Sequence, residues 1–192
     1  MVVKIKHYKI MQEYYTASKG CLKRKGKTSM ITCAGSPVVV IGPDWVCNVF
    51  LCSLLSIVLV LYVVFMGGMV VLPMRCVGYV LLSTWVMLYY IMTLGNPGVM
   101  MPKFIDAGKV NLTDPGMYCA QCNLMREKGD MHCLECGVCI KGYHHHCPAM
   151  GKCVGSRNLI FFKSFLIATS FSMTYLAVWG IYVVVYSIEQ DK

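Results

Sequence analysis

Three long stretches without a charged side chain constrain the fold of this chain more than any other feature. Each is longer than the roughly 20 residues that an α-helix needs to cross the hydrocarbon core of a bilayer. A single such stretch could be a buried helix of a soluble protein, but three of them in 192 residues, with a mean hydropathy of +0.58, favour a membrane protein. The uncharged stretches are residues 45–74, 76–102 and 164–188. They predict membrane-spanning helices at about residues 46–68, 76–94 and 161–186.

The basic residues predict how these helices are oriented. The first 44 residues carry eight Lys and Arg side chains, whereas the connection between the first two predicted spans carries only Arg75. Because basic residues concentrate in cytosolic loops, residues 1–44 are predicted to be a cytosolic tail, solvated around its most basic stretch, KRKGK at residues 23–27. Two spans later, residues 95–158 carry seven more basic side chains and are predicted to face the same side. After a third span, the chain would end on the lumenal side.

Asn111 offers a test of this orientation, because it begins the glycosylation motif Asn-Leu-Thr. A cytosolic segment never meets the glycosylation machinery, so we expect Asn111 to be unmodified. The measurement is the gel mobility of the protein before and after endoglycosidase treatment, with Asn111→Gln as the control. A mobility shift that disappears in Asn111→Gln would reverse the predicted orientation.

Most of the cysteines and histidines are crowded into one short segment. Residues 119–153 hold seven of the 12 cysteines and four of the five histidines. In a reducing cytosolic segment, this density indicates metal binding rather than disulfides. Two tetrahedral zinc sites would use eight of these donors and leave three. The donors in chain order are Cys119, Cys122, His132, Cys133, Cys136, Cys139, His144, His145, His146, Cys147 and Cys153.

Pairs of adjacent donors help to separate the eight zinc ligands from the three donors that are left over. The side chains of His132 and Cys133 diverge in an extended segment, so these two residues most easily serve different ions, and the two sites should interleave along the chain. The same argument applies to His146 and Cys147. If His146 turns toward a metal, Cys147 points elsewhere and becomes a candidate nucleophile.

The register of these donors resembles that of a known family. Together with CVGSRN at residues 153–158, the segment is similar to the cysteine-rich domain of the DHHC protein S-acyltransferases, or palmitoyltransferases. NPG at residues 96–98 resembles the DPG motif of that family, with Asn96 in place of aspartate. The resemblance implies an α-helical multi-pass membrane protein with a small cytosolic two-zinc cysteine-rich domain between the second and third spans. The expected divisions are the basic tail at residues 1–44, two spans within 45–94, the zinc domain at 95–160, the third span at 161–187 and a tail at 188–192.

The resemblance also implies roles for the donors. In the family, the cysteine that Cys147 matches accepts an acyl group from acyl-CoA and passes it to a cysteine of a substrate protein through a thioester intermediate. The histidine that His145 matches is the base that activates this thiol, and His144 stands where the family has an aspartate that orients the base. The two implied structural zinc ions would be bound by Cys119, Cys122, His132 and Cys139, and by Cys133, Cys136, His146 and Cys153.

The same resemblance implies the substrates and the setting. The expected substrates are palmitoyl-CoA or another long-chain acyl-CoA, and membrane-associated proteins with cysteines near the cytosolic face. The expected location is the lipid bilayer of the Golgi, the endoplasmic reticulum or the plasma membrane. No nucleic-acid partner is expected, because the excess basic charge lies beside a membrane span without a nucleic-acid-binding motif.

Departures from the family pattern leave two other interpretations open. His144 brings no negative charge to the base, Ala149 replaces a tryptophan, and Lys152 replaces an asparagine. The sequence also ends at SIEQDK, without a counterpart of the family's fourth span. A catalytically weak or inactive zinc-stabilised membrane adaptor of the same fold is therefore an alternative. A membrane-bound ubiquitin ligase with a RING-like domain would also interleave two zinc ions, but its ligand spacing fits poorly.

Overall fold

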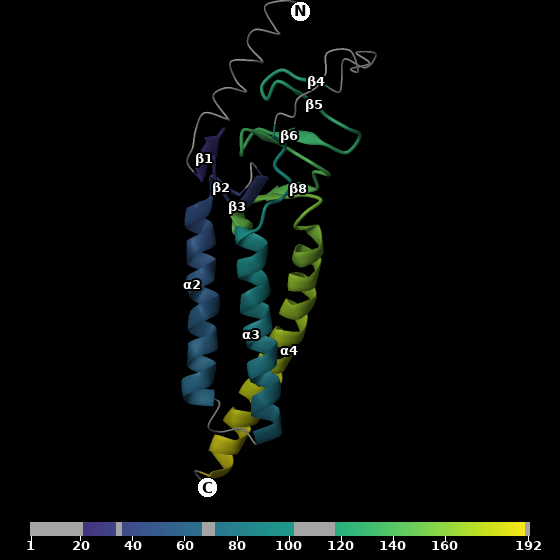
Figure 1. Cartoon of the computed structure of the whole chain (residues 1–192). Coiled ribbons are helices and arrows are strands. Elements are labelled where there is room, and N and C mark those ends of the chain that lie inside the picture. Colours follow the sequence, from purple (N-terminus) through teal and green to yellow (C-terminus); the bar gives the residue numbers. More distant parts are fainter. Residues whose placement is uncertain (1–20, 34–35, 67–71, 102–117, 191–192) are drawn as a thin grey trace, which may run out of the picture.

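The structure is a computed structural model that describes residues 21–33, 36–66, 72–101 and 118–190. Three long helices run side by side, and short strands gather at one end of them (Figure 1). All three helices are long and apolar enough to cross a membrane, which confirms that part of the prediction. Asn111 lies outside the described residues. The helices are α2 (Trp45–Leu61, continued by the π-helical segment η1, Tyr62–Met66), α3 (Leu72–Leu94) and α4 (Leu159–Gln190).

Aromatic and polar side chains hold the helices together. Near the middle of α3, Nε1 of Trp85 donates a hydrogen bond to Thr169 Oγ1 at 2.8 Å, and the indole ring stacks on Phe165 of α4. Farther from the strands, the hydroxyl oxygens of Tyr62 and Tyr175 lie 2.6 Å apart. Pairing these polar groups matters because an unpaired polar group in apolar surroundings costs free energy. The outward faces of α2 and α4 carry mostly exposed apolar side chains, as expected for helices that face lipid.

The stretch before α2 forms a three-stranded antiparallel sheet. Its strands are β1 (Leu22–Lys25), β2 (Thr28–Cys33) and β3 (Ser36–Ile41), in that order across the sheet. β-branched residues recur in β2 and β3, and such residues pack well on a pleated surface. The sheet corrects the expectation of a solvated tail over these residues.

The sheet packs against the cysteine-rich segment at the same end of the helices (Figure 1). Met30 of β2 and Val40 of β3 are buried in one apolar cluster with Val138 and Ile140. At the turn between β1 and β2, a side chain added to Gly26 would collide with the backbone of the cysteine-rich segment. This glycine also has a φ of +58°, a conformation that other residues rarely adopt. The sheet and the cysteine-rich segment therefore pack together at this end of the helices.

The cysteine-rich segment consists of three short antiparallel hairpins in succession. Hairpins of this size bury too little apolar surface to be stable alone. Six of the seven cysteines between residues 119 and 153 are buried and supply much of the interior, which points to bound metal as a source of stability. The pairs are β4 (Tyr118–Cys119) with β5 (Leu124–Met125), β6 (Met131–Cys133) with β7 (Val138–Ile140), and β8 (His145–Cys147) with β9 (Lys152–Val154). The last hairpin encloses a 3-10 turn, η3 (Pro148–Met150).

Candidate functional site

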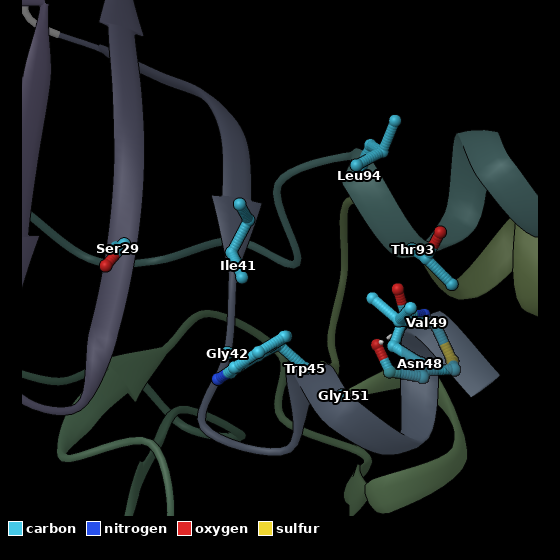
Figure 2. A pocket seen from close by; sticks show the side chains of 10 residues that line it. Ser29, Ile41, Gly42, Trp45, Asn48, Val49, Thr93, Leu94 and Gly151 are labelled. Atoms are coloured by element: carbon cyan, nitrogen blue, oxygen red, sulfur yellow. Dashed lines mark hydrogen bonds between the residues drawn. The ribbon is translucent and has the colours of Figure 1, made fainter. Parts of the chain in front are cut away.

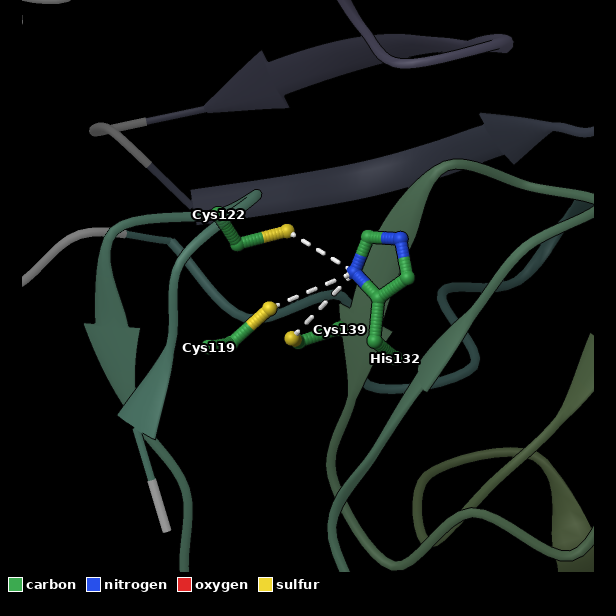
Figure 3. A group of neighbouring side chains, drawn as sticks. All are labelled: Cys119, Cys122, His132 and Cys139. Carbon is green, nitrogen blue, oxygen red and sulfur yellow. Dashed lines mark hydrogen bonds between the residues drawn. The ribbon is translucent and has the colours of Figure 1, made fainter. Parts of the chain in front are cut away.

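The first group of metal donors joins the first two hairpins (Figure 3). Cys119 and Cys122 come from β4 and the turn after it, whereas His132 and Cys139 are opposite each other in β6 and β7. The sulfur atoms of Cys119, Cys122 and Cys139 lie 3.5, 3.3 and 3.7 Å from Nδ1 of His132. Three thiols and one imidazole nitrogen thus converge on one point.

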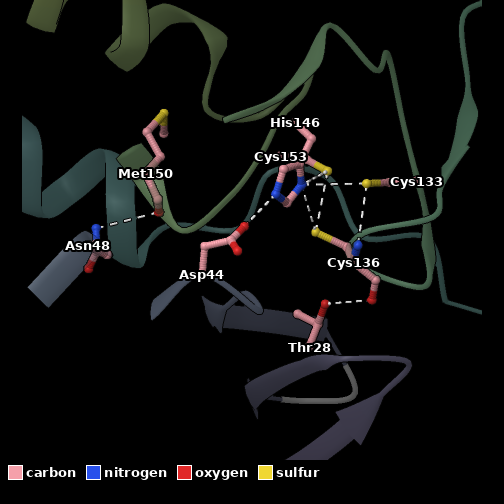
Figure 4. Close-up of polar contacts among 8 residues, drawn as sticks. All are labelled: Thr28, Asp44, Asn48, Cys133, Cys136, His146, Met150 and Cys153. Carbon is pink, nitrogen blue, oxygen red and sulfur yellow. Dashed lines mark hydrogen bonds and ion pairs between the residues drawn. The ribbon is translucent and has the colours of Figure 1, made fainter. Parts of the chain in front are cut away.

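The second group repeats this arrangement with the second and third hairpins (Figure 4). Cys133 and Cys136 belong to β6 and the turn after it, and His146 and Cys153 are opposite each other in β8 and β9. The sulfur atoms of Cys133, Cys136 and Cys153 lie 3.5, 3.4 and 3.6 Å from Nδ1 of His146. The neighbours His132 and Cys133 therefore belong to different groups, as their opposite directions along the strand predict.

The geometry of both groups fits zinc. With Zn–S bonds of about 2.3 Å and Zn–N bonds of about 2.0–2.1 Å, a tetrahedral site places sulfur and nitrogen about 3.5 Å apart. Within each group, all four donor atoms lie within 4.8 Å of one another. Three cysteines and one histidine are a donor set typical of structural zinc sites. The structure thus brings together the eight residues that the resemblance assigns to zinc, in the same two sets.

The two groups follow one pattern along the chain. Each donor of the second group comes 14 residues after the matching donor of the first, so the spacing within the groups is identical. After the second cysteine of each group, Asn123 and Gly137 have positive φ angles of 51° and 66°, which turn the chain into the next strand.

A third turn of the same kind begins at Cys147. A further shift of 14 residues places Cys147 at the first-cysteine position, Met150 at the second-cysteine position, and Gly151, with a φ of 71°, at the position of Gly137. This third turn lacks the second thiol that would complete a metal site. Cys147 accordingly lies outside both groups of donors.

Cys147 lies where the hairpins meet the helices, two residues after His145 in β8. It is half-buried and packs against the apolar cluster that the helix ends form with Met150 and Val154. Alternation along β8 directs His145 and Cys147 to one side of the strand and His146 to the other. Nδ1 of His144 lies 2.8 Å from Nδ1 of His145, so one of these rings donates a hydrogen bond to the other. Burial lowers the pKa of His145, and the neighbouring His144 and His146 lower it further.

A comparison with protein families agrees with this geometry. A family model described as DHHC palmitoyltransferase matches residues 112–192, which include both groups of donors and α4. The chain carries a DHHC palmitoyltransferase domain. The match confirms the resemblance that the sequence indicates. A search of curated proteins gave no match.

Asn96, just before the DHHC domain, makes hydrogen bonds that an aspartate at this position could make only in part. Its Oδ1 accepts hydrogen bonds from the backbone N–H groups of Gly98 and Val99 at 2.8 and 2.9 Å. Its Nδ2 donates to the carbonyl oxygen of Pro37 in β3 at 2.9 Å. A carboxylate could accept the first two bonds but could not donate the third. The amide therefore suits a chain in which β3 packs against this turn.

Two buried lysines, Lys25 and Lys152, lie near the two groups of metal donors. Lys152 Nζ donates to the carbonyl oxygen of Val40 at 2.7 Å and to that of Gly95, while Lys25 Nζ donates to the carbonyl oxygen of Met100 at 2.9 Å. Burial lowers the pKa of Lys152 to about 7, although the thiols of the second group oppose this shift. Burial also lowers the pKa of Lys25, and the thiols of the first group oppose it in the same way.

The lysines have an electrostatic role beside filled zinc sites. Three thiolates, one neutral imidazole and one Zn²⁺ together carry a charge of about −1. Each group of the DHHC domain has one buried lysine near its thiols, Lys25 for the first and Lys152 for the second. A lysine ammonium group would therefore balance the charge of each zinc centre. The solvated role expected for KRKGK does not hold for Lys25, which is 8% exposed.

Lys152→Met should lower the free energy of unfolding by roughly 2–4 kcal/mol, because it leaves two buried carbonyl groups without a hydrogen-bond donor. The measurement is thermal or denaturant unfolding of the full chain in detergent. Lys141→Met is the matched control, since the side chain of Lys141 is exposed and its ion pair with Glu127 should contribute little. Equal stability of the two variants would contradict the structural role of Lys152.

The turn after Cys147 is anchored to the helices by contacts that the sequence did not reveal. Tyr89 donates its hydroxyl proton to the carbonyl oxygen of Ala149 at 2.7 Å. Asn48 Nδ2 donates to the carbonyl oxygen of Met150 at 3.4 Å, as Figure 4 shows. The helices thereby hold the backbone of η3. Ala149 fills the position of the family tryptophan with a small side chain while its backbone is fixed by Tyr89.

A pocket lies where the N-terminal sheet, the start of α2 and the end of α3 meet (Figure 2). Its lining is mostly apolar and does not include Cys147 among the described residues. The pocket reaches the turn after Cys147 through Met150 and Gly151. The lining residues are Ser29, Ile41, Gly42, Trp45, Asn48, Val49, Thr93, Leu94, Met150 and Gly151.

Proposed function

We propose that this protein is a protein-cysteine S-acyltransferase that carries a long-chain acyl group, such as palmitoyl, as a thioester on Cys147. The observation that carries this proposal is the position of Cys147. Its thiol is the one in the cysteine-rich segment that neither group of donors uses, and it lies against the apolar cluster of the helices. A free thiol beside a histidine and an apolar surface suits transfer of a fatty acyl group.

The proposed reaction has two steps that exchange one thioester for another. The Cys147 thiolate attacks the carbonyl carbon of acyl-CoA, a bond forms between this carbon and Sγ, and the bond to the CoA sulfur breaks. The thiolate of a substrate cysteine then attacks the carbonyl carbon of the acyl group, the bond from this carbon to Sγ of Cys147 breaks, and the Cys147 thiolate takes up the proton that the substrate thiol lost. The acyl group thus moves from CoA to the substrate protein without any change of oxidation state.

His145 is the proposed base. When Nδ1 of His145 donates its proton to Nδ1 of His144, Nε2 keeps a lone pair that can accept the thiol proton of Cys147. A cysteine normally titrates near pH 8.5, so a neighbouring base is needed to form the thiolate at cytosolic pH. His145 can return the same proton to the departing CoA sulfur. His144 supports this tautomer, but it lacks the charge that would stabilise a protonated His145.

The zinc ions are proposed to stabilise the domain rather than to take part in the reaction. With four protein ligands each, both sites would be closed to water and substrate. The first group would fasten β4 and β5 to the middle hairpin, and the second would fasten the middle hairpin to β8. The second group thereby fixes the backbone next to Cys147.

The helices are proposed to receive the acyl chain. Phe162 and Phe165 at the start of α4 and Leu159 pack against the same cluster as Cys147. Burial of an acyl chain contributes up to about 0.8 kcal/mol per methylene, so a long chain would bind with few polar contacts. Substrates would be membrane-associated proteins with cysteines near the cytosolic face, and the protein would reside in an endomembrane or the plasma membrane with its zinc domain cytosolic.

Acyl labelling tests the proposal. The purified chain in detergent is incubated with an alkyne-tagged long-chain acyl-CoA, and the tag is detected before and after treatment with neutral hydroxylamine, which cleaves thioesters. We expect a hydroxylamine-sensitive label that Cys147→Ser removes. Cys52→Ser is the matched control, since Cys52 also packs against the apolar cluster but lies in α2. A chain that holds two zinc ions and takes up no label would contradict the proposal.

His144 favours a second candidate function. Because a neutral imidazole provides no negative charge, the same fold could serve as a membrane adaptor that binds partner proteins without acyl transfer. The labelling experiment separates the two functions. An unlabelled chain with both zinc ions in place is the result expected for the adaptor.

A further inference from the structure

Asp44 joins the start of the first long helix to the second group of donors. Its Oδ2 lies 2.7 Å from Nε2 of His146, although the two residues are 102 positions apart in the sequence (Figure 4). The other ring nitrogen of His146, Nδ1, faces the three sulfur atoms of the group. The imidazole therefore lies between a carboxylate on one side and the metal position on the other.

The position of Asp44 in the helix makes this contact informative. Asp44 is the N-cap residue of α2, where an aspartate usually accepts a hydrogen bond from a backbone N–H of the first turn. In the described structure its side chain makes no such capping bond. The carboxylate is instead directed to His146, whose side chain is only 10% exposed.

Among the described residues, the first group has no equivalent of this contact. Within the described part of the chain, His132 has no carboxylate within ion-pair distance, although its Nδ1 faces three sulfur atoms in the same way. The two groups share donor types and spacing, so among the described residues the carboxylate is a difference between them. It occurs at the group whose histidine is the neighbour of Cys147.

We propose that Asp44 is a positioning residue that holds His146 through Nε2 and thereby strengthens zinc binding in the second group. A histidine that binds a metal through one nitrogen commonly donates its other N–H to a carboxylate, which fixes the tautomer and raises the basicity of the ligand. Here the carboxylate comes from the N-terminus of a membrane helix. Asp44 thus connects α2 to β8, the strand that carries Cys147. Movement of the start of α2 would therefore disturb the second zinc site before the first. This inference rests on zinc occupancy of the second group in the proposed function.

The test is the rate at which each zinc ion passes from the full chain in detergent to a chromogenic chelator. Cys153→Ser identifies the release phase of the second group, because it removes a ligand of that group alone. Asp44→Asn keeps the shape of the side chain and removes its charge, and we expect it to speed release from the second group about tenfold. Asp44→Ala also removes the hydrogen bond and should speed release by up to about 100-fold. Release from the first group should be unchanged in both variants.

Asp130→Asn is the matched control. Asp130 is a buried carboxylate of the DHHC domain, and it accepts hydrogen bonds from the backbone N–H groups of Glu127 and Gly142 rather than facing a donor histidine. Asp130→Asn should leave the ratio of the two zinc release rates unchanged, whereas the Asp44 variants should change this ratio. If the wild type binds two zinc ions and Asp44→Ala leaves the ratio of the two release rates unchanged, the inference about Asp44 is overturned but the proposed zinc assignment is not. A wild-type chain without zinc in the second group would overturn it together with the proposed zinc assignment.

Discussion

Cys147→Ser should abolish the acyl label and keep both zinc ions, whereas Cys153→Ser should lose about one zinc ion per chain. The two cysteines lie on facing strands of one hairpin, so a general disturbance of this hairpin would affect both variants alike. Only Cys153 belongs to a four-donor group. The opposite outcomes therefore separate a ligand from a nucleophile.

The size of the Cys153→Ser effect follows from the role of structural zinc. Zinc binding to small domains contributes on the order of 10 kcal/mol, and this free energy is part of the free energy of folding. Loss of one ion should unfold the third hairpin and lower the midpoint of thermal unfolding strongly. Metal analysis by mass spectrometry, together with thermal unfolding, measures both effects. Zinc loss in Cys147→Ser would identify Cys147 as a ligand and remove the proposed nucleophile.

His144→Asp should raise the rate of acyl transfer to Cys147 about tenfold, which requires about 1.4 kcal/mol of additional transition-state stabilisation. Nδ1 of His145 already has a hydrogen-bond partner at 2.8 Å in His144, so the geometry of the pair exists and only the charge is missing. A carboxylate at this position would stabilise the protonated form of His145 that arises when the Cys147 thiol loses its proton. Single-turnover labelling with acyl-CoA measures the rate.

Two controls accompany this prediction. His145→Ala should suppress labelling in both the wild-type and the His144→Asp background, because it removes the proposed base. Zinc content should be unchanged in all of these variants, since neither histidine belongs to a group of donors. Equal labelling rates for wild type and His144→Asp, with both zinc ions bound, would show that the charge at this position does not limit the reaction.

The helices and the metal donors could be predicted from the sequence because their signals are local. An uncharged run of more than about 20 residues predicts a spanning helix without reference to the rest of the chain. The opposite directions of His132 and Cys133 follow from strand geometry alone. The 14-residue repeat of donors was also present in the sequence, and it would have marked Cys147 as the first cysteine of an incomplete third turn without any knowledge of a family.

The N-terminal sheet and its contacts could not be predicted in the same way. The partners of Thr28, Asp44 and Lys152 lie 108, 102 and 112 residues away in the sequence. KRKGK reads locally as a solvated basic stretch, and only the tertiary structure places Lys25 near a group of thiols. In the sequence alone, Asn96 is a loss of charge relative to aspartate, and only the structure shows that its amide donates a hydrogen bond to Pro37.

The distance in sequence between the sheet and its partners has a consequence for biosynthesis. The N-terminal strands leave the ribosome first, but the surfaces that cover Met30 and Val40 are made only after two long helices have been synthesised. Contacts between distant segments form slowly, and unpaired strands are exposed to aggregation until they form. If the two groups of donors bind zinc as proposed, the supply of zinc at that stage would influence whether the cysteine-rich hairpins fold and cover these strands. In zinc-poor cells, newly made chains should therefore be degraded faster than chains already folded, even though both have the same sequence.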